Sequence, residues 1–307
     1  MQTSQQIVGQ FRRKRLFIAA MVAVLVLVLT LSFRFFEEKS RIEQQSRDFA
    51  NHTIARFDRM FSPLDVSANN TQALVGLRCG EVRFPLIENL ASLQTVRAIL
   101  LVDHGNIYCS SIYGERAISF SEAYPELAIS SQRMLLTTDN YLLKGSPVLM
   151  LWTPKTLDNH SGLIQVINIE LMSNYLLEPT LPWVERAVFN VGGRSLEYGN
   201  PLIEEALPSA DEVSYEESSL RYPFSITLFG PPPARLALMT LPSQLPLALL
   251  LSMLTSYIVW LATANRMSMA WQISYGLTAK EFMVYCQPII NASSGNCDGI
   301  ELLLRWA

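Results

Sequence analysis

Charge of either sign is scarce in this sequence, and neither sign dominates. Only 17% of the residues are Asp, Glu, Lys or Arg, and 24 basic side chains stand against 27 acidic ones. A nucleic-acid-binding domain usually carries a dense basic patch, but here the only dense basic cluster is the short run 12–15. We therefore expect no nucleic-acid partner.

Histidine is rarer still, with three residues, His52, His104 and His160. Their spacing matches no metal-binding motif, and the region around them shows no catalytic constellation. We expect surface or turn positions for all three. This reasoning leaves open a pocket for a small ligand.

The sequence is rich in apolar residues, which gather in two long uncharged runs. Residues 16–33 would span about 27 Å as a helix, close to the ~30 Å hydrocarbon core of a bilayer, and residues 245–264 form the second run. The alternatives are a cleaved signal peptide for the first run and a buried core helix for the second. However, the first run is longer than a usual signal segment and lacks its cleavage site, and the second carries Tyr257 and Trp260 near one end. We expect two transmembrane helices, 16–34 and 241–264.

The basic run Arg12–Arg15 sets the expected orientation. Under the positive-inside rule residues 1–15 lie in the cytoplasm, and the second span returns the chain to that side. Residues 35–240 then face the opposite compartment. Residues 265–279 form a cytoplasmic connector, and residues 280–307 begin another domain.

The segment between the spans mixes helix and strand signals. Apolar residues recur at helical spacing just after the first span, which predicts that its helix continues outward. Several apolar runs then predict strands, including a hairpin whose turn is Asp103-His104-Gly105-Asn106. We expect an α+β domain, ended by a stiff linker at residues 231–233. The helical stripe is Ile42, Phe49, Ile54, Phe57 and Phe61, and the strands are 98–102, 107–114, 148–152, 163–169, 187–191, 195–198 and 224–229.

The four cysteines form two pairs, separated by the second span. Cys79 and Cys109 lie between the spans, whereas Cys286 and Cys297 follow the second. An even pair in an oxidising compartment readily forms a disulfide, while cytoplasmic cysteines stay reduced. A Cys79–Cys109 bridge would close a loop of about 30 residues and contribute roughly 3–4 kcal/mol in the chain-entropy model. Spacing alone does not distinguish a stabilising disulfide from a redox sensor.

Two strands joined by a turn are predicted at the end of the sequence. EFMVYCQPII covers residues 281–290, the turn covers 291–296, and GIELLLRW covers 299–306. A lone pair of such strands cannot cover its own faces, and it is marginally stable by itself.

These last residues resemble the opening of the EAL domain, the family of cyclic-di-GMP phosphodiesterases. The family's first segment carries Gln-Pro-Ile, here Gln287-Pro288-Ile289, and Glu-x-Leu-x-Arg, here Glu301 to Arg305. Leu302 stands where alanine is typical, at a position not expected to touch the substrate.

Cys109-Ser110-Ser111 resembles the CSS-motif sensor domain that precedes EAL domains in bacteria. In that domain the motif cysteine pairs with an upstream cysteine, which Cys79 would supply. The segments LQTVRAI, KGSPVL, WTP and LLEP extend the resemblance over nearly the whole chain.

The EAL resemblance implies a (β/α)8 barrel of which residues 280–307 hold the first two strands. The family binds Mg²⁺ or Mn²⁺ and hydrolyses cyclic-di-GMP to linear pGpG. By match, Glu301 would be a metal ligand, Arg305 a phosphate contact, and Gln287 and Leu303 part of the nucleotide-binding surface. The family's later segments, with the other metal ligands, are absent from these residues. We therefore expect a chain cut short near the start of the EAL domain, which neither binds metal stably nor hydrolyses the substrate.

The CSS resemblance implies a protein of the bacterial inner membrane with cytoplasmic termini and a periplasmic sensor domain. Its Cys79–Cys109 disulfide would respond to redox state and react with periplasmic thiol–disulfide oxidoreductases. Two alternatives stay open. A non-enzymatic redox sensor would act through association, for example as a homodimer. A small-ligand receptor would be stabilised by its ligand in both redox states.

Overall fold

Two compact units make up the chain in the computed structural model. The first, the α+β unit, covers residues 38–238. The second, the helix–hairpin unit, combines residues 1–37 with 239–307. The structure describes residues 4–129, 133–138, 146–155, 160–199, 204, 206–266 and 269–306.

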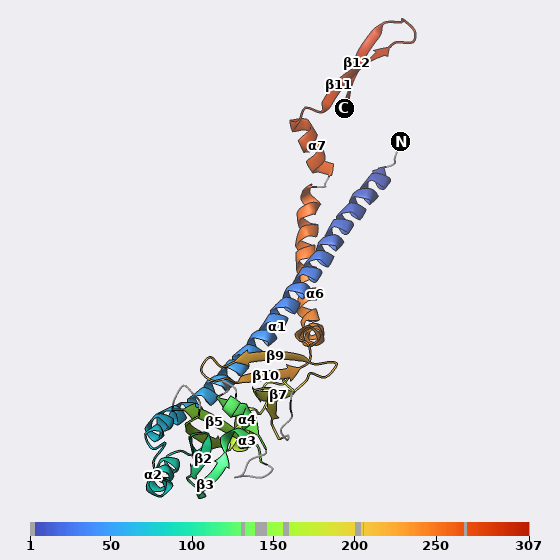
Figure 1. Cartoon of the computed structure of the whole chain (residues 1–307). Coiled ribbons are helices and arrows are strands. Elements are labelled where there is room, and N and C mark those ends of the chain that lie inside the picture. Colours follow the sequence, from blue (N-terminus) through green and yellow to red (C-terminus); the bar gives the residue numbers. More distant parts are fainter. Residues whose placement is uncertain are drawn as a thin grey trace. The chain divides into compact units, whose positions relative to one another are not determined.

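Helix α1, Ser4–Gln72, runs through the first apolar segment and on into the α+β unit (Figure 1). Its 69 residues measure roughly 100 Å at ~1.5 Å per residue. The predicted outward continuation of the first helix is therefore confirmed. Within the predicted stripe, Phe49 packs partly buried against the core, and the buried members are Ile42, Ile54, Phe57 and Phe61.

A six-stranded antiparallel sheet forms the larger part of the α+β unit. Its strands are β1 Val96–Asp103, β2 Asn106–Ser110, β3 Gly114–Ser119, β4 Met134–Thr137, β5 Val148–Pro154 and β6 Gly162–Ile167. They pair in the order β3-β2-β1-β6-β5-β4. The predicted hairpin is present: His104 and Gly105 join β1 to β2 with φ angles of 45° and 75°. Positive φ at both positions suits the tight turn whose twist matches that of the strands.

The two faces of this sheet are covered by different helices. From β1, Ile99 enters the core shared with α1 and α2 (Cys79–Ala91). Its neighbour Leu100 enters a second core, shared with the short helices α3 (Phe120–Ala123) and α4 (Pro125–Ile129). Successive strand residues point to opposite faces, so an apolar strand such as β1 serves both cores.

A four-stranded sheet completes the α+β unit after helix α5, Ile169–Leu176. Its strands are β7 Arg186–Val191, β8 Arg194–Glu197, β9 Val213–Ser218 and β10 Ser225–Gly230, paired in the order β8-β7-β10-β9. The ring of Phe57 in α1 lies 4.8 Å from the ring of Phe189 and 5.8 Å from that of Phe224. Residues of α1 and of both sheets therefore pack together in a single hydrophobic core.

The helix–hairpin unit contains α6 (Pro233–Arg266), α7 (Met269–Thr278), β11 (Phe282–Ile290) and β12 (Cys297–Trp306). Helix α6 lies beside the start of α1. The Ser252 hydroxyl donates to the carbonyl of Ala23 at 2.8 Å, and the Ser256 hydroxyl donates to that of Ala19 at 3.0 Å. The predicted terminal strands and turn are present as β11 and β12.

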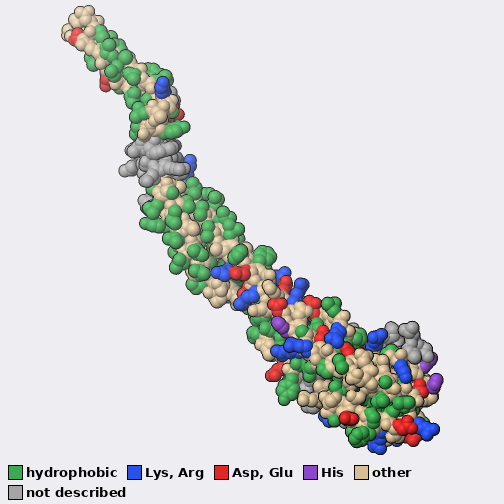
Figure 2. Space-filling view, turned by 90° about the vertical axis from the view of Figure 1, so that its left-hand side faces the viewer, with side chains coloured by type: hydrophobic (Ala, Val, Ile, Leu, Met, Phe, Trp, Pro, Cys, Tyr) green, Lys and Arg blue, Asp and Glu red, His purple; other side chains and the backbone are tan. Residues whose placement is uncertain are grey.

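Both long helices contain a stretch long and apolar enough to cross a membrane. Only 6% of the first apolar window and 11% of the second are buried, so these stretches find little cover within the protein. Figure 2 shows hydrophobic side chains over the helical segments, whereas Lys, Arg, Asp and Glu gather on the α+β unit. In the helix–hairpin unit, the Arg15 guanidinium lies 5.1 Å from the Trp260 ring and donates to the Trp260 carbonyl at 2.9 Å.

Some predicted boundaries differ from those observed. The strand expected over 163–169 ends at Ile167, because Asn168 is the N-cap of α5. The linker expected at 231–233 is shorter, because Pro233 is the first residue of α6. Proline suits the first turn of a helix, where its missing N–H needs no partner. The segment 241–264 therefore lies inside a longer helix. In the expected connector, residues 267 and 268 lie outside the described residues, and 269–278 are helical.

Candidate functional site

A disulfide between Cys79 and Cys109 links the first residue of α2 to β2. The two Cα atoms lie 5.3 Å apart, and the pairing is the predicted one. Cys79 has an exposed fraction of 8%, whereas Cys109 exposes none of its surface. Both residues belong to the core between α1 and the six-stranded sheet. The bridge therefore fixes the start of α2 to that face of the sheet.

The two serines after Cys109 have structural partners. Ser110 accepts hydrogen bonds on its hydroxyl from the N–H groups of Ile112 and Tyr113, both at 3.3 Å, and so closes the turn. The Ser111 hydroxyl accepts from the N–H of Ile99 at 3.0 Å, and the Ser111 N–H donates to the Ile99 carbonyl at the same distance. Both serines are buried. The Cys-Ser-Ser sequence thus combines a covalent bond, a turn and one extra pairing of β2 with β1.

Side chains from the sheet hold the turn between α1 and α2. The Tyr108 hydroxyl accepts from the N–H of Gly76 at 3.0 Å and lies 3.4 Å from the Leu74 carbonyl, to which it donates. The Lys155 ammonium donates to the Val75 carbonyl at 2.8 Å. Burial raises the pKa of Tyr108, which keeps the hydroxyl protonated and able to donate. The segment leading to the disulfide is therefore held at several points.

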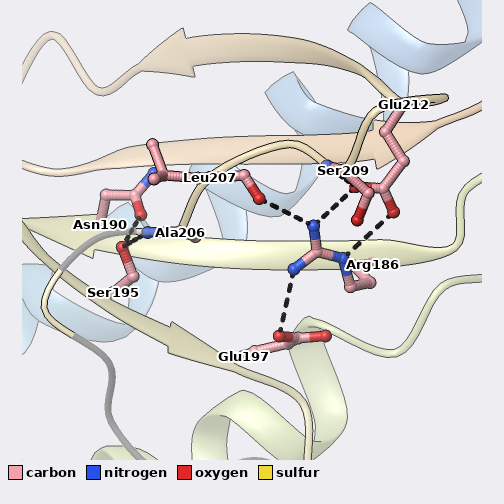
Figure 3. Close-up of polar contacts among 8 residues, drawn as sticks. All are labelled: Arg186, Asn190, Ser195, Glu197, Ala206, Leu207, Ser209 and Glu212. Atoms are coloured by element: carbon pink, nitrogen blue, oxygen red, sulfur yellow. Dashed lines mark hydrogen bonds and ion pairs between the residues drawn. The ribbon is translucent and has the colours of Figure 1, made fainter.

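A second group of polar side chains surrounds Arg186 at the start of β7 (Figure 3). Its guanidinium donates to Glu212 at 2.7 and 3.3 Å and to the Leu207 carbonyl at 3.2 Å. It also lies 3.6 Å from a Glu197 oxygen and 4.5 Å from the centre of the Phe229 ring. The hydrogen bond from Arg186, followed by one from a backbone N–H, holds the pKa of Glu212 below its usual range although burial opposes this. The network anchors the loop before β9.

A cavity of about 550 Å³ lies beside this network. On its wall the Asn190 amide donates to the Thr227 hydroxyl at 2.7 Å. The Ser195 hydroxyl donates to the Asn190 side-chain oxygen at 2.7 Å (Figure 3). The Ala206 N–H donates to Ser195 at 3.1 Å. These wall groups therefore already have partners within the protein.

Another cavity, of about 690 Å³, lies beside the turn that Ser110 closes with Ile112 and Tyr113, called here the CSS turn. Its lining combines the buried Leu100, Ile107 and Ser110 with the exposed Tyr113 and Arg116. The Arg116 guanidinium lies 5.0 Å from the centre of the Tyr113 ring. Both cavities have the size of small-molecule sites.

The four residues matched to the EAL motif share one face of the β11–β12 hairpin. Gln287 pairs directly with Glu301, and Tyr285 pairs with Leu303. Because side chains alternate along a strand, positions 301, 303 and 305 point the same way as their partners across the hairpin. The Arg305 guanidinium lies 5.4 Å from the centre of the Tyr285 ring. The hairpin thus brings together all four residues that the motif match singled out.

This hairpin does not supply a complete metal site. Asp298 accepts a hydrogen bond from the Asn291 amide at 2.7 Å, and Glu281 accepts from the Trp306 ring N–H at 2.9 Å. Within the described part of the chain, no group of three or more His, Cys, Asp and Glu side chains is placed to hold a metal ion. Mg²⁺ requires near-octahedral oxygen coordination. Glu301 with the Gln287 amide therefore does not fit a divalent ion without further ligands.

Sequence reasoning did not single out Arg186 or its carboxylate partners. Glu212 is 26 positions away in the chain, so no local pattern connects it to Arg186. The roles of Ser110 and Ser111 also became clear only from the pairing of β1 with β2. Motif matching found the position of these serines but not their contacts.

Residues 43–241 match the family described as "CSS motif domain associated with EAL". The whole chain is 42% identical over 306 residues to the probable cyclic di-GMP phosphodiesterase PdeD of Escherichia coli (strain K12), and 21% identical over 301 residues, 96% of this chain, to the probable cyclic di-GMP phosphodiesterase PdeN of the same organism. The chain spans 58% and 57% of the lengths of these relatives.

Solved sensor structures show a weaker likeness. The sensor domain of the V. cholerae histidine kinase DctB matches with a TM-score of 0.40 at 10% identity, over 64% of this chain and 98% of that one. The periplasmic domain of RsbU from Chlamydia trachomatis matches with a TM-score of 0.34 at 13% identity, over 71% and 96%. At these scores the likeness carries no functional argument.

Proposed function

Because the chain belongs to the family of the CSS motif domain associated with EAL, we propose that it is the sensing and membrane-anchoring part of a cyclic-di-GMP phosphodiesterase. The 42% identity with a probable phosphodiesterase of this specificity carries the proposal, since it extends over the whole chain, terminal hairpin included. The chain spans 58% of that relative, so hydrolysis to pGpG is proposed for the protein that contains the complete barrel.

The proposed placement is a bacterial inner membrane with two spans. The apolar stretches of α1 and α6 are long enough to cross the hydrocarbon core, and the run Arg12–Arg15 favours a cytoplasmic N-terminus. The α+β unit between the spans would then lie in the periplasm, where its disulfide is chemically stable. The terminal hairpin would lie in the cytoplasm with the nucleotide.

The shared face of the hairpin supports the proposed roles of its residues. Glu301 would contribute one metal ligand and Arg305 would contact phosphate through its planar donor fork. Gln287 and Leu303, on the same face, would contact the nucleotide. Mg²⁺ or Mn²⁺ would activate water in the complete site. The remaining ligands must come from outside these two strands, because the hairpin alone does not fit the ion.

A chimera tests whether this hairpin works as part of a phosphodiesterase site. Residues 1–307 are joined to the part of PdeD that follows the matched region, and cyclic-di-GMP hydrolysis is measured with Mg²⁺ or Mn²⁺. We expect pGpG from the chimera and none from residues 1–307 alone. Glu301→Gln should lower the rate at least about 10- to 100-fold, because losing even an outer-shell partner of a metal ligand has an effect of that size.

Asp298→Asn is the matched control, because Asp298 is a carboxylate on the same strand whose partner is the turn residue Asn291. Its chimera should retain hydrolysis within about threefold. If Glu301→Gln were as active as this control, or if residues 1–307 alone produced pGpG, the proposed division of roles would be wrong.

We further propose that the Cys79–Cys109 disulfide controls this activity. The bridge fixes the start of α2 to the sheet, so reduction releases a constraint in the α+β unit. Dithiothreitol should raise hydrolysis by the chimera in membranes. With both cysteines replaced by alanine, the rate should stay at the reduced level whether or not dithiothreitol is added. A dithiothreitol effect that survived this replacement would rule out control by the disulfide.

A further inference from the structure

We propose that the cavity on the four-stranded sheet binds a small hydroxylated amine of the amino-sugar class, and that this ligand acts on helix α1 through the loop between β9 and β10. The site goes beyond the phosphodiesterase function proposed above and does not depend on it. The cavity measures about 550 Å³, the size of a small-molecule site. It is called here the β9 cavity, and it is lined by side chains of all four strands and by parts of the segments 206–208 and 219–223.

The floor of the β9 cavity is the polar face of the four-stranded sheet. On β10, Ile226 and Leu228 point into the core shared with α1, so Thr227 between them points to the opposite face. The same alternation places polar residues of every strand on that face, and direct pairing brings them together. These residues are Ser195 of β8, Asn190 of β7, Ser225 and Thr227 of β10, and Glu216 and Ser218 of β9. The floor therefore presents hydroxyls, an amide and a carboxylate.

Two segments of the chain form the walls, and internal hydrogen bonds fix them. In the segment 206–208, the Ala206 N–H donates to the Ser195 hydroxyl at 3.1 Å. In the loop between β9 and β10, the Ser219 hydroxyl accepts from the N–H of Tyr222 at 3.1 Å. The walls therefore stand in place without a ligand, which lowers the ordering cost of binding one.

The charge of the lining indicates the class of ligand. Among the described residues that line the cavity, Glu216 is the only charged side chain. Its Oε1 accepts from the Ser225 hydroxyl at 2.6 Å, whereas its Oε2 has no hydrogen-bond partner in the described part of the chain. The neighbouring Arg186 adds no net positive charge, because Glu212 and Glu197 both lie against it. A carboxylate with an available oxygen favours a cation, most simply a protonated amine.

Hydroxyl groups on both sides of this carboxylate favour a ligand that also carries hydroxyls. Ser214 and Ser218 lie two positions before and after Glu216 on β9, so the three side chains point to the same face. Both serines are exposed, and within the described residues neither hydroxyl makes a hydrogen bond. A serine hydroxyl both donates and accepts. A ligand with one ammonium group and several hydroxyls can therefore pair with all three side chains.

The loop between β9 and β10 connects the β9 cavity to α1. Ser219 and Tyr222 line the cavity and also contact two carboxylates of the helix. The Ser219 hydroxyl donates to Asp58 at 2.7 Å, and the Tyr222 hydroxyl donates to Asp65 at 2.7 Å. Arg221, between them, donates to Asp65 at 2.8 Å. A ligand that contacts this loop therefore acts on the side chains that hold α1, the helix that contains the first apolar stretch.

Three sugars of similar size test the class of ligand. Glucosamine carries an ammonium group, glucose has a hydroxyl in its place, and glucuronate carries a carboxylate. With the full chain in lipid nanodiscs, calorimetric titration should show glucosamine binding at least about tenfold more tightly than glucose, because hydrogen bonds between charged groups are the stronger ones. Glucuronate should bind more weakly than glucose, since Glu216 repels it. Equal affinities, tighter binding of glucuronate, or no binding of glucosamine at about 10 mM would overturn the proposal.

Substitutions on β9 locate the site. Glu216→Gln keeps the shape of the side chain and removes its charge, so it should weaken glucosamine binding at least about tenfold and leave glucose binding unchanged. Glu217→Gln is the matched control, because Glu217 is the next residue of β9 and points to the other face. Ser218→Phe should abolish binding of both sugars, because its ring occupies the cavity. Equal effects of the two glutamate substitutions would refute the site.

Hydrogen exchange tests the connection to α1. Glucosamine should slow backbone exchange in residues 219–223 and in α1 near Asp58 and Asp65, and Glu216→Gln should remove this slowing. Protection confined to the strands, with none in α1, would refute the action on the helix. None of these measurements uses phosphodiesterase activity, so failure of this site and failure of the proposed function are distinguishable.

Discussion

Removing the disulfide should destabilise the α+β unit by an amount that can be calculated before the experiment. The perturbation is the double substitution Cys79→Ala and Cys109→Ala, which removes the bridge and leaves no buried polar group. Helix α2 then keeps only noncovalent anchors, such as Val82 and Leu86 in the core. Its N-cap residue, Arg78, makes no side-chain capping bond, so no local hydrogen bond from that side chain replaces the bridge.

The expected magnitude follows from the loop that the bridge closes. The cysteines are 30 positions apart, and the chain-entropy model gives about 3.6 kcal/mol for a loop of that length at 25 °C. In a unit of roughly 200 residues, each kcal/mol shifts the melting temperature by about 2–4 °C. The melting temperature should therefore fall by roughly 7–14 °C.

Calorimetry of the full chain in nanodiscs measures this shift, and backbone hydrogen exchange locates it. Exchange should increase most in the first turns of α2 and in β2 near Cys109. The double substitution of the exposed cysteines, Cys286→Ser and Cys297→Ser, is the control and should leave the melting temperature unchanged. A fall below about 3 °C in the disulfide variant, or exchange that rises uniformly over both sheets, would refute the reasoning.

Three further substitutions test other contacts. Ser111→Ala leaves the buried N–H of Ile99 without its hydroxyl partner and should cost about 1–3 kcal/mol in urea unfolding, whereas a loss below about 0.5 kcal/mol would show that water replaces the hydroxyl. Gly162→Ala places a Cβ against the backbone of a neighbouring strand and should cost about 1–3 kcal/mol; an unchanged unfolding midpoint would show that the strand gives way freely. Because the pKa of Glu212 is lowered by Arg186, its stabilising effect is present above about pH 4.5 and lost as the pH falls through the lowered value. Glu212→Gln should therefore weaken the fall of the melting temperature between pH 4.5 and 3, and an identical pH profile would rule out this contribution.

Hydrophobic patterning predicted the elements whose burial is strong. The stripe in α1 and the strands around 98–102, 148–152 and 187–191 carry apolar residues that face a core. The spacing of these residues therefore predicts whether each segment is a helix or a strand. The hairpin turn could be predicted too, because His104-Gly105 stands between two such runs. These patterns are local, because each can be recognised from the residues of the segment itself.

The missed elements have weak local signals. Helix α2 contains Gly80 and Pro85, both poor helix residues in solution, and it is held by the sheet and the disulfide. Strand β4 has four residues, and β9 is an edge strand with mainly polar residues, so neither shows a clear apolar alternation. Tertiary contacts determine these elements, and no single-sequence pattern contains that information.

The candidate-site residues also fall into two groups: those that a local motif identifies and those that only the fold brings together. The motif match identified Gln287, Glu301, Leu303 and Arg305, and strand alternation alone would place the last three on one face. Their pairing across the hairpin with β11 needed the register. The contacts of Arg186 could not be predicted from the sequence, because its partners come from distant segments.

Gly80 separates two properties of a redox switch that are often confused. The reduction potential depends on the free energies of the bridged and reduced states, and in the bridged state a Cβ added at Gly80 would meet nothing within 4 Å. The rate of thiol–disulfide exchange depends instead on access to the attacked sulfur. A substitution at Gly80, the residue after Cys79, would therefore separate the two properties if it changed the exchange rate while the reduction potential stayed the same.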